Sequence, residues 1–260
     1  MNIINVPSVH LVAQQEVNSI PCAEFLEAHG VEHWNTDTDN AGEQLVEIAG
    51  RLCYMSFAKP RPGGNQAYIN HILEVGHGSV LEHAVYSMIF TGVSRSLTHE
   101  LVRHRAGMSY SQLSQRYVDK VSFVRPPGIK PESSAELVWT SNIALALASY
   151  ESLIETLEYN DFADIDNPTL RRKRARETAR SVLPNCTETK IFVTGNARAW
   201  RHFLELRGSI HADAEIQRLA IAVLKVLQAE SPNLFANPNA AKIQKPTAKS
   251  VLSTIRSTIS

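Results

Sequence analysis

Residues 84–116 read AVYSMIFTGVSRSLTHELVRHRAGMSYSQLSQR and predict a strand, a helix and a loop in succession. Large apolar residues alternate with other residues over the first ten positions, which is typical of a strand with one well-packed face. That face would consist of Tyr86, Met88 and Phe90. A helix is predicted over residues 96–105, because two leucines lie one turn apart and Gly107 breaks the pattern. Residues 107–114 are then expected to form a loop.

The rest of the chain predicts a mixed α/β fold in which helix predominates. Helical patterns, several of them capped or stopped by proline, cover residues 43–54, 66–75, 135–159, 167–184, 196–207 and 214–230. Short strands are expected at residues 9–14 and 191–193. Because no repeat or low-complexity linker divides the sequence, we expect a single domain over residues 1–260, with a small, largely antiparallel sheet packed by helices. Residues 240–260 form a basic, Ser/Thr-rich tail that is expected to be mobile.

Composition favours a cytoplasmic protein that binds small anions. Lys plus Arg equals Asp plus Glu at 26 each, the three cysteines lack paired spacing, and no stretch is apolar enough to cross a membrane. Residues 171–180, RRKRARETAR, nevertheless hold six cations. Local positive charge on a neutral protein suits small anionic ligands better than nucleic acid. An RNA-binding module remains the competing hypothesis, based on this basic run and the basic tail.

The run Arg103-His104-Arg105 is difficult to explain as a solvated face. On a helix the two arginines point roughly 200° apart, and on a strand the histidine faces away from both. One of these side chains is then expected to point toward the body of the protein, where it must meet an anion or hydrogen-bond acceptors. The alternative is a basic helix end on the surface.

The predicted helix over residues 196–207 carries an arginine within its apolar face. At 100° per residue, Arg207 falls between Trp200 and Phe203, while Arg198 and His202 line the other side. Arg207 either extends past the helix end into solvent or meets a buried anion or polar ligand. Taken alone, Arg198 and His202 are also typical of a solvated pair.

The helix over residues 168–183 places Arg172, Arg176 and Arg180 on one stripe. Arginine is suited to forked recognition of phosphate, but a solvated basic face relieved by Glu177 with Lys173 is an alternative. Arg180 fits the solvated reading least, because it lies nearest the apolar C-terminal turn.

Metal and thiol chemistry are not expected. His99 and His104 lie five residues apart, too far round a helix to share one metal ion. Cys186 has no neighbouring histidine in sequence and is read as a small buried hydrophobe. The chain also lacks a glycine-rich phosphate loop that opens a helix, so a Rossmann dinucleotide site is not expected.

Five sequence blocks together resemble one known family, the flavin-dependent thymidylate synthases. Arg103-His104-Arg105, eight residues and then Ser114-Gln115-Arg116-Tyr117 is similar to the family signature. The other blocks are residues 76–83 (GHGSVLEH), 177–184 (ETARSVLP), 196–198 (NAR) and 206–212 (LRGSIHA), and the resemblance spans residues 40–230. The common signature has seven residues before the serine. The extra residue falls within residues 106–111, an expected loop, where insertion costs little.

The resemblance implies the methylation of dUMP to dTMP, with FAD as cofactor and with 5,10-methylenetetrahydrofolate and NADPH as co-substrates. It also implies a homotetramer with shared active sites. FAD would be held by Ser79, Arg103, His104, Arg105, Gln112, Asn196, Arg198 and His202. The nucleotide would be held by Glu100, Arg103, Gln112, Ser114, Gln115, Arg116, Arg180 and Arg207, with His77 and Glu82 lining the cavity. Arg207 would be the catalytic residue, stabilising negative charge that develops on the uracil.

Overall fold

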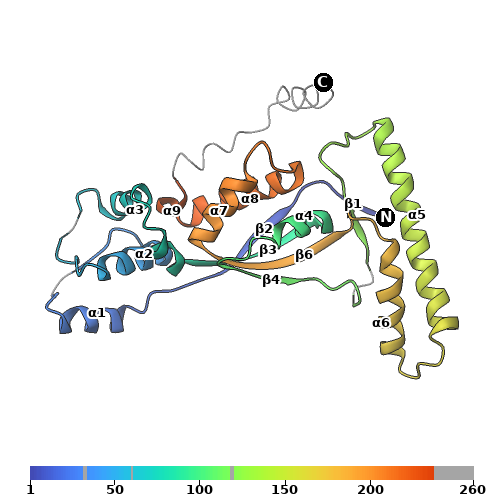
Figure 1. The fold of residues 1–260 in the computed structure, drawn as a ribbon, viewed down its shortest axis with the longest axis horizontal. Helices are drawn as coiled ribbons and strands as arrows, with labels where there is room; N and C mark the ends of the chain where they lie inside the picture. The colour runs from blue at the N-terminus through green and yellow to red at the C-terminus, as the bar shows by residue number, and fades with distance from the viewer. Residues whose placement is uncertain (32–33, 60, 118–119, 237–260) are drawn as a thin grey trace. The chain divides into compact units, whose positions relative to one another are not determined.

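The computed structural model describes residues 1–31, 34–59, 61–117 and 120–236 (Figure 1). Helices hold 52% of the described residues, and a small antiparallel sheet is accompanied by one parallel strand pair. The predicted mixed α/β class, with helix predominating, is therefore confirmed. The expected mobile tail, residues 240–260, lies outside the described residues.

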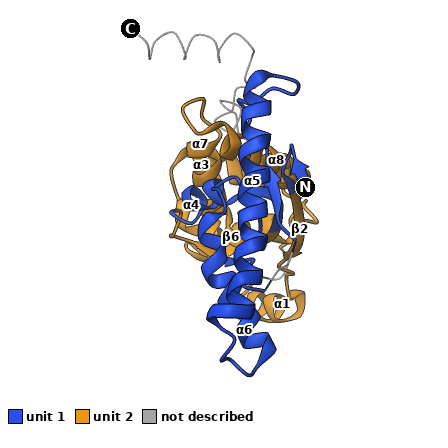
Figure 2. Cartoon of the chain, turned by 90° about the vertical axis from the view of Figure 1, so that its right-hand side faces the viewer, with its two compact units in different colours: residues 1–8, 89–103, 110–192 blue, residues 9–88, 104–109, 193–260 orange. Residues whose placement is uncertain are grey.

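The chain divides into two compact units, coloured separately in Figure 2. Unit 1 comprises residues 1–8, 89–103 and 110–192, and unit 2 comprises residues 9–88, 104–109 and 193–260. That residues 1–260 form one domain stays a prediction. Among the described residues, none of the helices combines the length and apolarity that crossing a bilayer requires.

The elements follow one another in the order shown in Figure 1. The strands are β1 (Asn2–Ile4), β2 (Ser8–Gln14), β3 (Val85–Ser94), β4 (Met108–Gln112), β5 (Ser122–Val124) and β6 (Glu188–Asn196). The α-helices are α1 (Ser19–Ala28), α2 (Ala41–Leu52), α3 (Gly64–Glu74), α4 (Arg95–Leu101), α5 (Ser134–Thr156), α6 (Pro168–Ala179), α7 (Ala197–Arg207), α8 (Ala214–Glu230) and α9 (Pro232–Phe235). Three further helical turns are η1 (Gly78–His83), η2 (Leu157–Asp161) and η3 (Arg180–Val182).

The four-stranded sheet has the order β2-β3-β6-β4. The alternation predicted for β3 is confirmed, since Tyr86, Met88 and Phe90 are all essentially inaccessible to solvent. The predicted loop over residues 107–114 is wrong, because most of it is strand β4 beside β6. Its sequence MSYSQ alternates Met108 and Tyr110 with more exposed serines, but the run is short and follows Gly107, so the alternation alone does not indicate a strand. Residues 106–111, in which the extra residue of the signature falls, thus consist of a turn at 106–107 and the first four residues of β4.

Helix α4 ends at Leu101, earlier than the predicted end at residue 105. The Tyr110 hydroxyl donates a hydrogen bond to the Leu101 carbonyl at 3.0 Å and so satisfies one of the last carbonyls of the helix. The Ser94 side chain accepts from the Leu97 N–H at the other end. The two hydrogen bonds fix the ends of α4. Arg95 is therefore its first residue, and the RHR run follows its last turn.

Helix α7 in unit 2 confirms the helix predicted over residues 196–207. The Asn196 side chain caps its start by accepting from the Ala199 N–H at 2.9 Å. Trp200 and Phe203 are fully buried, and the Trp200 indole donates to the Tyr86 carbonyl at 3.4 Å. Burial of these two aromatic side chains holds the helix at the end of β3.

A buried polar network stabilises the first half of unit 2. Glu47 and Arg51 of α2 form an ion pair at 2.7 Å with almost no solvent exposure. The neighbouring Glu43 carboxylate accepts from both the backbone N–H and the side chain of Asn233 in α9. Because each buried charge has hydrogen-bonding partners, the network joins the chain's first helices to its last described helix.

In unit 1, helices α5 and α6 run side by side (Figure 1). Asn167 caps α6 and Pro168 is its first residue, as the sequence predicts. Strand β1 pairs in parallel with β5, in a register that sets Ile3 against Phe123. The helix predicted to reach residue 184 stops at Ala179 and continues as the tighter turn η3, which begins at Arg180.

Gly107 is expected to be intolerant of a side chain. Its φ is +70°, and an added Cβ would stand 2.6 Å from the Asn196 side-chain nitrogen. Gly107→Ala should therefore lower the free energy of unfolding in urea by about 1–3 kcal/mol. Gly128→Ala is the matched control, because that glycine has open space around its Cβ position and no positive φ. Equal effects of the two substitutions would contradict this reading.

Candidate active site

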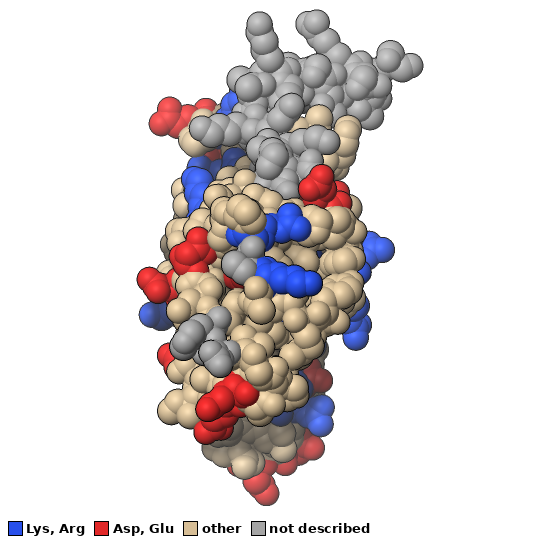
Figure 3. Space-filling view, turned by 90° about the vertical axis from the view of Figure 1, so that its left-hand side faces the viewer, with Lys and Arg blue, Asp and Glu red and all other residues tan. Residues whose placement is uncertain are grey.

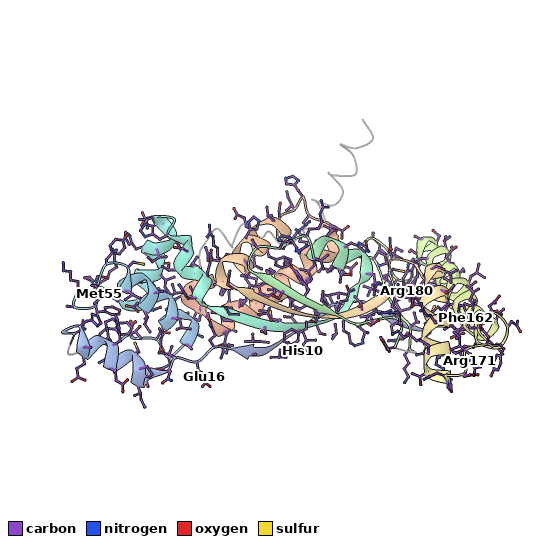
Figure 4. All side chains as sticks on the ribbon, turned by 60° about the horizontal axis from the view of Figure 1, so that its bottom comes forward. His10, Glu16, Met55, Phe162, Arg171 and Arg180 are labelled. Carbon is purple, nitrogen blue, oxygen red and sulfur yellow. The ribbon has the colours of Figure 1, made fainter. Side chains whose placement is uncertain are left out.

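Three arginines from separate segments of unit 1 line one cavity of about 470 Å³. We call it the arginine pocket, and its lining residues are Arg95, Gln112, Leu113, Ser114, Gln115, Arg116 and Arg180. The first comes from the start of α4, the next five from the end of β4 and the turn after it, and the last from η3. Figure 4 shows Arg180 at one end of α6 and Arg171 near the other.

Hydrogen bonds hold the segment after β4 in place. The Gln112 side-chain amide donates to the hydroxyls of Thr98 (3.1 Å) and Thr189 (3.3 Å). The Leu113 N–H donates to the Lys190 carbonyl at 2.8 Å. The turn that carries Ser114, Gln115 and Arg116 is thereby anchored to both α4 and β6 within unit 1.

The charge balance of the arginine pocket favours an anion. Burial lowers the pKa of Arg95, and the nearby Arg180 guanidinium lowers it further. Within the described part of the chain, the buried Nη1 of Arg95 has no hydrogen-bond partner. A buried donor without a partner is costly, and two cations beside each other repel. A negatively charged ligand with several acceptor oxygens would relieve both penalties.

Arg116 lies between the pocket and helix α6. Its guanidinium pairs with Glu177 at 3.6 Å, and both side chains are about one-third exposed (38% and 35%). Lys173 lies over the ring of Tyr117, with its amine 5.1 Å from the ring centroid. These contacts tie the turn after β4 to α6.

The predicted stripe of three arginines has three different environments. Arg172 is exposed and pairs with Glu158 at 3.3 Å, whereas Arg176 is buried, which lowers its pKa. Only Arg180 lines the pocket. The alternative is a solvated basic face relieved by Glu177 with Lys173. In the structure, Glu177 pairs with Arg116 and with Arg174 of the same helix, while Lys173 lies over the Tyr117 ring. The helix therefore presents a single arginine to this cavity.

A second group, the imidazole cluster, lies in unit 2 and consists of His104, His202, Phe203 and Arg207. The Arg207 Nε–H donates to the Nε2 atom of His104 at 3.0 Å. The His104 ring packs edge-on against Phe203 and His202, with centroid separations of 5.4 and 6.0 Å. Of the residues in the RHR run, His104 is half-buried while both arginines are exposed. The member of the run that points inward is the histidine.

The environment of His104 keeps its imidazole neutral. Burial lowers its pKa to about 4, with further contributions from the positive charge of Arg207 and from His202. The predicted placement of Arg207 within an apolar face holds in part, because Trp200 and Phe203 are buried but Arg207 itself is half-exposed. Its guanidinium meets an imidazole rather than bulk solvent alone.

The remaining predicted residues of unit 2 lie at η1 and α7. The Arg198 guanidinium pairs with Glu82 at 2.6 Å, and both side chains are about half exposed, as expected for a solvated pair. Ser79 and His77 are exposed at the start of η1, while Asn196 is committed to capping α7. In unit 1, Glu100 is half-buried in α4 and Arg103 is exposed directly after it.

The comparisons with known proteins identify the family. Residues 36–233 match the family described as "Thymidylate synthase complementing protein". A flavin-dependent thymidylate synthase of Mycolicibacterium gilvum (strain PYR-GCK) is 50% identical over 233 residues, which cover 88% of each chain. The chain belongs to the flavin-dependent thymidylate synthase family. It is therefore a methyltransferase that uses a flavin, as its sequence blocks predict.

Other relatives carry the same name. The flavin-dependent thymidylate synthase of Mycobacterium tuberculosis (strain ATCC 25618 / H37Rv) is 53% identical over 208 residues, covering 78% of this chain and 82% of that protein. The one of Mycobacteroides abscessus (strain ATCC 19977) is 50% identical over 218 residues, covering 82% and 86%. The similarity thus extends over most of each protein, and the family match over residues 36–233 includes both groups of candidate site residues.

The donor set of unit 2 fits a phosphorylated flavin. Arg198 and His202 line a cavity of about 270 Å³ and are both exposed. A Cβ on Gly78 would stand 3.2 Å from the Arg198 Nε, so the missing side chain lets the guanidinium lie close to the backbone. The Arg198 guanidinium at this cavity suits a phosphate group, although the carboxylate of Glu205 also lies in the cavity wall. Because Glu82 already pairs with Arg198, a bound phosphate would either share the Arg198 guanidinium with that carboxylate or displace the carboxylate from it.

Arg95 is the member of the arginine pocket that the sequence analysis missed. It is the first residue of α4, where the positive end of the helix dipole disfavours a cation. An arginine directly after a serine N-cap is therefore a signal that a negative partner is needed. That signal was available in the sequence, but the cavity becomes visible only when residues 112–116 and 180 lie beside it.

The face shown in Figure 3 carries acidic and basic side chains interspersed over a largely uncharged surface. An extended basic tract, which a nucleic-acid backbone requires, is not seen on this face. The expected absence of a nucleic-acid partner and the cytoplasmic location both stay predictions.

His104 makes stability depend on pH. Its folded-state pKa of about 4 lies below the ordinary value of 6.5, so the unfolded chain binds a proton first as the pH falls. The neutral imidazole's contribution is therefore present above about pH 6.5 and is lost as the pH falls toward 4. His104→Gln should flatten the dependence of the unfolding free energy on pH in this window. The exposed His29→Gln is the control, and identical pH profiles for wild type and His104→Gln would contradict the assignment.

Proposed function

We propose that this protein methylates dUMP to dTMP, with FAD as bound cofactor, 5,10-methylenetetrahydrofolate as carbon donor and NADPH as reductant. The single observation that carries the proposal is the arginine pocket, in which the buried Nη1 atom of Arg95 has no hydrogen-bond partner among the described residues and the charge of Arg180 is nearby. A nucleotide monophosphate supplies the dianion and the acceptor oxygens that this pocket needs.

The arginine pocket is proposed to hold the phosphate of dUMP. Arg95, Arg116 and Arg180 would donate to its oxygens, with Ser114 and Gln115 beside them. Each charge-assisted hydrogen bond contributes about 1.5–3 kcal/mol. Gln112, whose amide donates to two threonines, leaves its carbonyl oxygen as an acceptor for the ligand. Glu100 and Arg103 complete the proposed nucleotide set.

Arg207 is proposed to act on the uracil ring. Methylation requires electron density to build up at carbon 5, and a guanidinium beside the ring's imide favours loss of the imide proton and stabilises the negative charge. Its half-buried position strengthens that interaction, since the surroundings are less polar than water. The flavin, when bound, supplies the reducing chemistry, so the protein needs no thiolate nucleophile.

FAD is proposed to bind to Ser79, Arg103, His104, Arg105, Gln112, Asn196, Arg198 and His202. Of these, Arg198 and His202 are the exposed donors at the cavity of unit 2. The proposed assembly is a homotetramer whose subunits share active sites.

Loss of the pocket's cations should weaken binding of the phosphate specifically. Arg95→Gln or Arg180→Gln should each raise the Kd for dUMP by about 10- to 100-fold, the loss expected for one charge-assisted hydrogen bond. Neither should change the weaker binding of 2′-deoxyuridine, which lacks the phosphate. Arg172→Gln, on the same helix but paired with Glu158, should leave both affinities unchanged in calorimetric titrations. Equal losses for nucleotide and nucleoside would contradict the phosphate assignment.

The reaction itself is tested on purified protein. It should be yellow, its flavin absorption should shift when dUMP is added, and it should form dTMP when the folate and NADPH are supplied. Arg207→Ala should retain flavin but lose turnover by about 10²-fold or more. Colourless protein that fails to bind added FAD would overturn the proposal.

A further inference from the structure

The contact between Arg207 and His104 determines which nitrogen atoms of the two side chains carry a proton. The guanidinium Nε carries one hydrogen and always donates, since arginine stays protonated in proteins. The Nε2 atom of His104, 3.0 Å away, must therefore accept. An accepting Nε2 leaves the proton of the neutral imidazole on Nδ1. The geometry thus requires a neutral histidine in a defined tautomer.

The plane of the accepting ring is set by packing. Phe203 is fully buried and meets the His104 ring edge-on at an interplanar angle of 77°. His202 meets it from the same helix at 66°. Two tilted ring contacts restrict rotation of the imidazole, so its lone pair has a defined direction. Helix α7 therefore supplies both the arginine and the rings that orient its acceptor.

We propose that His104 is a positioning residue, whose neutral imidazole holds the Nε edge of Arg207 so that the two Nη groups face the substrate. This inference rests on the proposed role of Arg207 at the uracil ring. A guanidinium held at Nε keeps its opposite edge as a two-pronged donor, which matches two adjacent acceptors of the imide. Without the hydrogen bond to His104, the Arg207 side chain samples several rotamers, and its two Nη groups no longer point in one direction.

Burial opposes protonation of His104, and so do Arg207 and His202. Arg207 and His202 face it from α7, and Arg103 and Arg105 flank it on its own segment. Its lowered pKa keeps the acceptor available at neutral pH. Protonation would place an N–H on Nε2 against the Arg207 N–H and end the contact.

A double-mutant cycle tests the proposal through kcat at saturating dUMP and FAD. His104→Phe keeps a flat ring but removes the acceptor, and should lower kcat by about 10²-fold, the loss typical of a misplaced catalytic group. His104→Gln, whose amide oxygen reaches near the Nε2 position, should recover at least about tenfold of that loss. Flavin content per subunit, measured by absorption, separates this effect from any loss of FAD.

Arg207→Lys supplies the other side of the cycle, because lysine has no Nε–H donor at that position. If His104 acts through Arg207, His104→Phe should add little to Arg207→Lys, and the double variant should match the single one within about threefold. The inference would be overturned if the loss of kcat in the double variant were the product of the losses in the two single variants. It would also be overturned if His104→Phe and His104→Gln had equal kcat values.

A readout without turnover separates this inference from the proposed function. If the wild-type enzyme formed no dTMP, the proposed function would fail. Crystal structures of the wild type and the two His104 variants would still decide the positioning role. The Arg207 guanidinium should keep its orientation in His104→Gln and turn away in His104→Phe. The same orientation in all three would refute the proposal.

Discussion

The partly buried guanidinium of Arg95 in unit 1 is the constraint that explains the arginine pocket. Burial lowers the pKa of Arg95, the charge of Arg180 lowers it further, and the Nη1 atom of Arg95 is shut off from water. Two unrelated local features place these arginines. The Ser94 cap starts α4 at Arg95, and the tight turn η3 after α6 begins at Arg180. Such an arrangement costs stability unless a ligand compensates it. The pocket is thus more informative about function than the well-packed core.

In unit 2, Arg207 has a neutral polar partner, unlike the Arg95 Nη1 atom in unit 1, which has none among the described residues. Arg207 sits at the end of α7 beside an imidazole that is kept neutral, so a polar group satisfies the guanidinium without cancelling its charge. A carboxylate in that place would pair with Arg207 and neutralise the positive field on which its proposed role at the uracil ring depends. Arg198, by contrast, pairs with Glu82 at an exposed position, where its charge is already screened. The two contacts suit an electrostatic role for Arg207 and a ligand-holding role for Arg198.

Local patterns in the sequence predicted the elements whose stability is local. The alternation in β3 and the capped helix α7, with Trp200 and Phe203 facing inward, follow from spacing alone. Strand β4 was missed, because MSYSQ is a short run directly after Gly107 and its partner strand β6 lies far away in the sequence. The buried Glu43 also escaped prediction, since its partner Asn233 lies 190 residues away. Arg95 was missed for the same reason, because its neighbours in the pocket come from distant segments.

The most direct test of the account is a crystal structure of the flavin-loaded enzyme grown with dUMP. The account predicts that the phosphate lies in the arginine pocket, with its oxygens about 2.7–3.2 Å from nitrogens of Arg95, Arg116 and Arg180. A phosphate bound elsewhere, with these three side chains directed into bulk water, would contradict it.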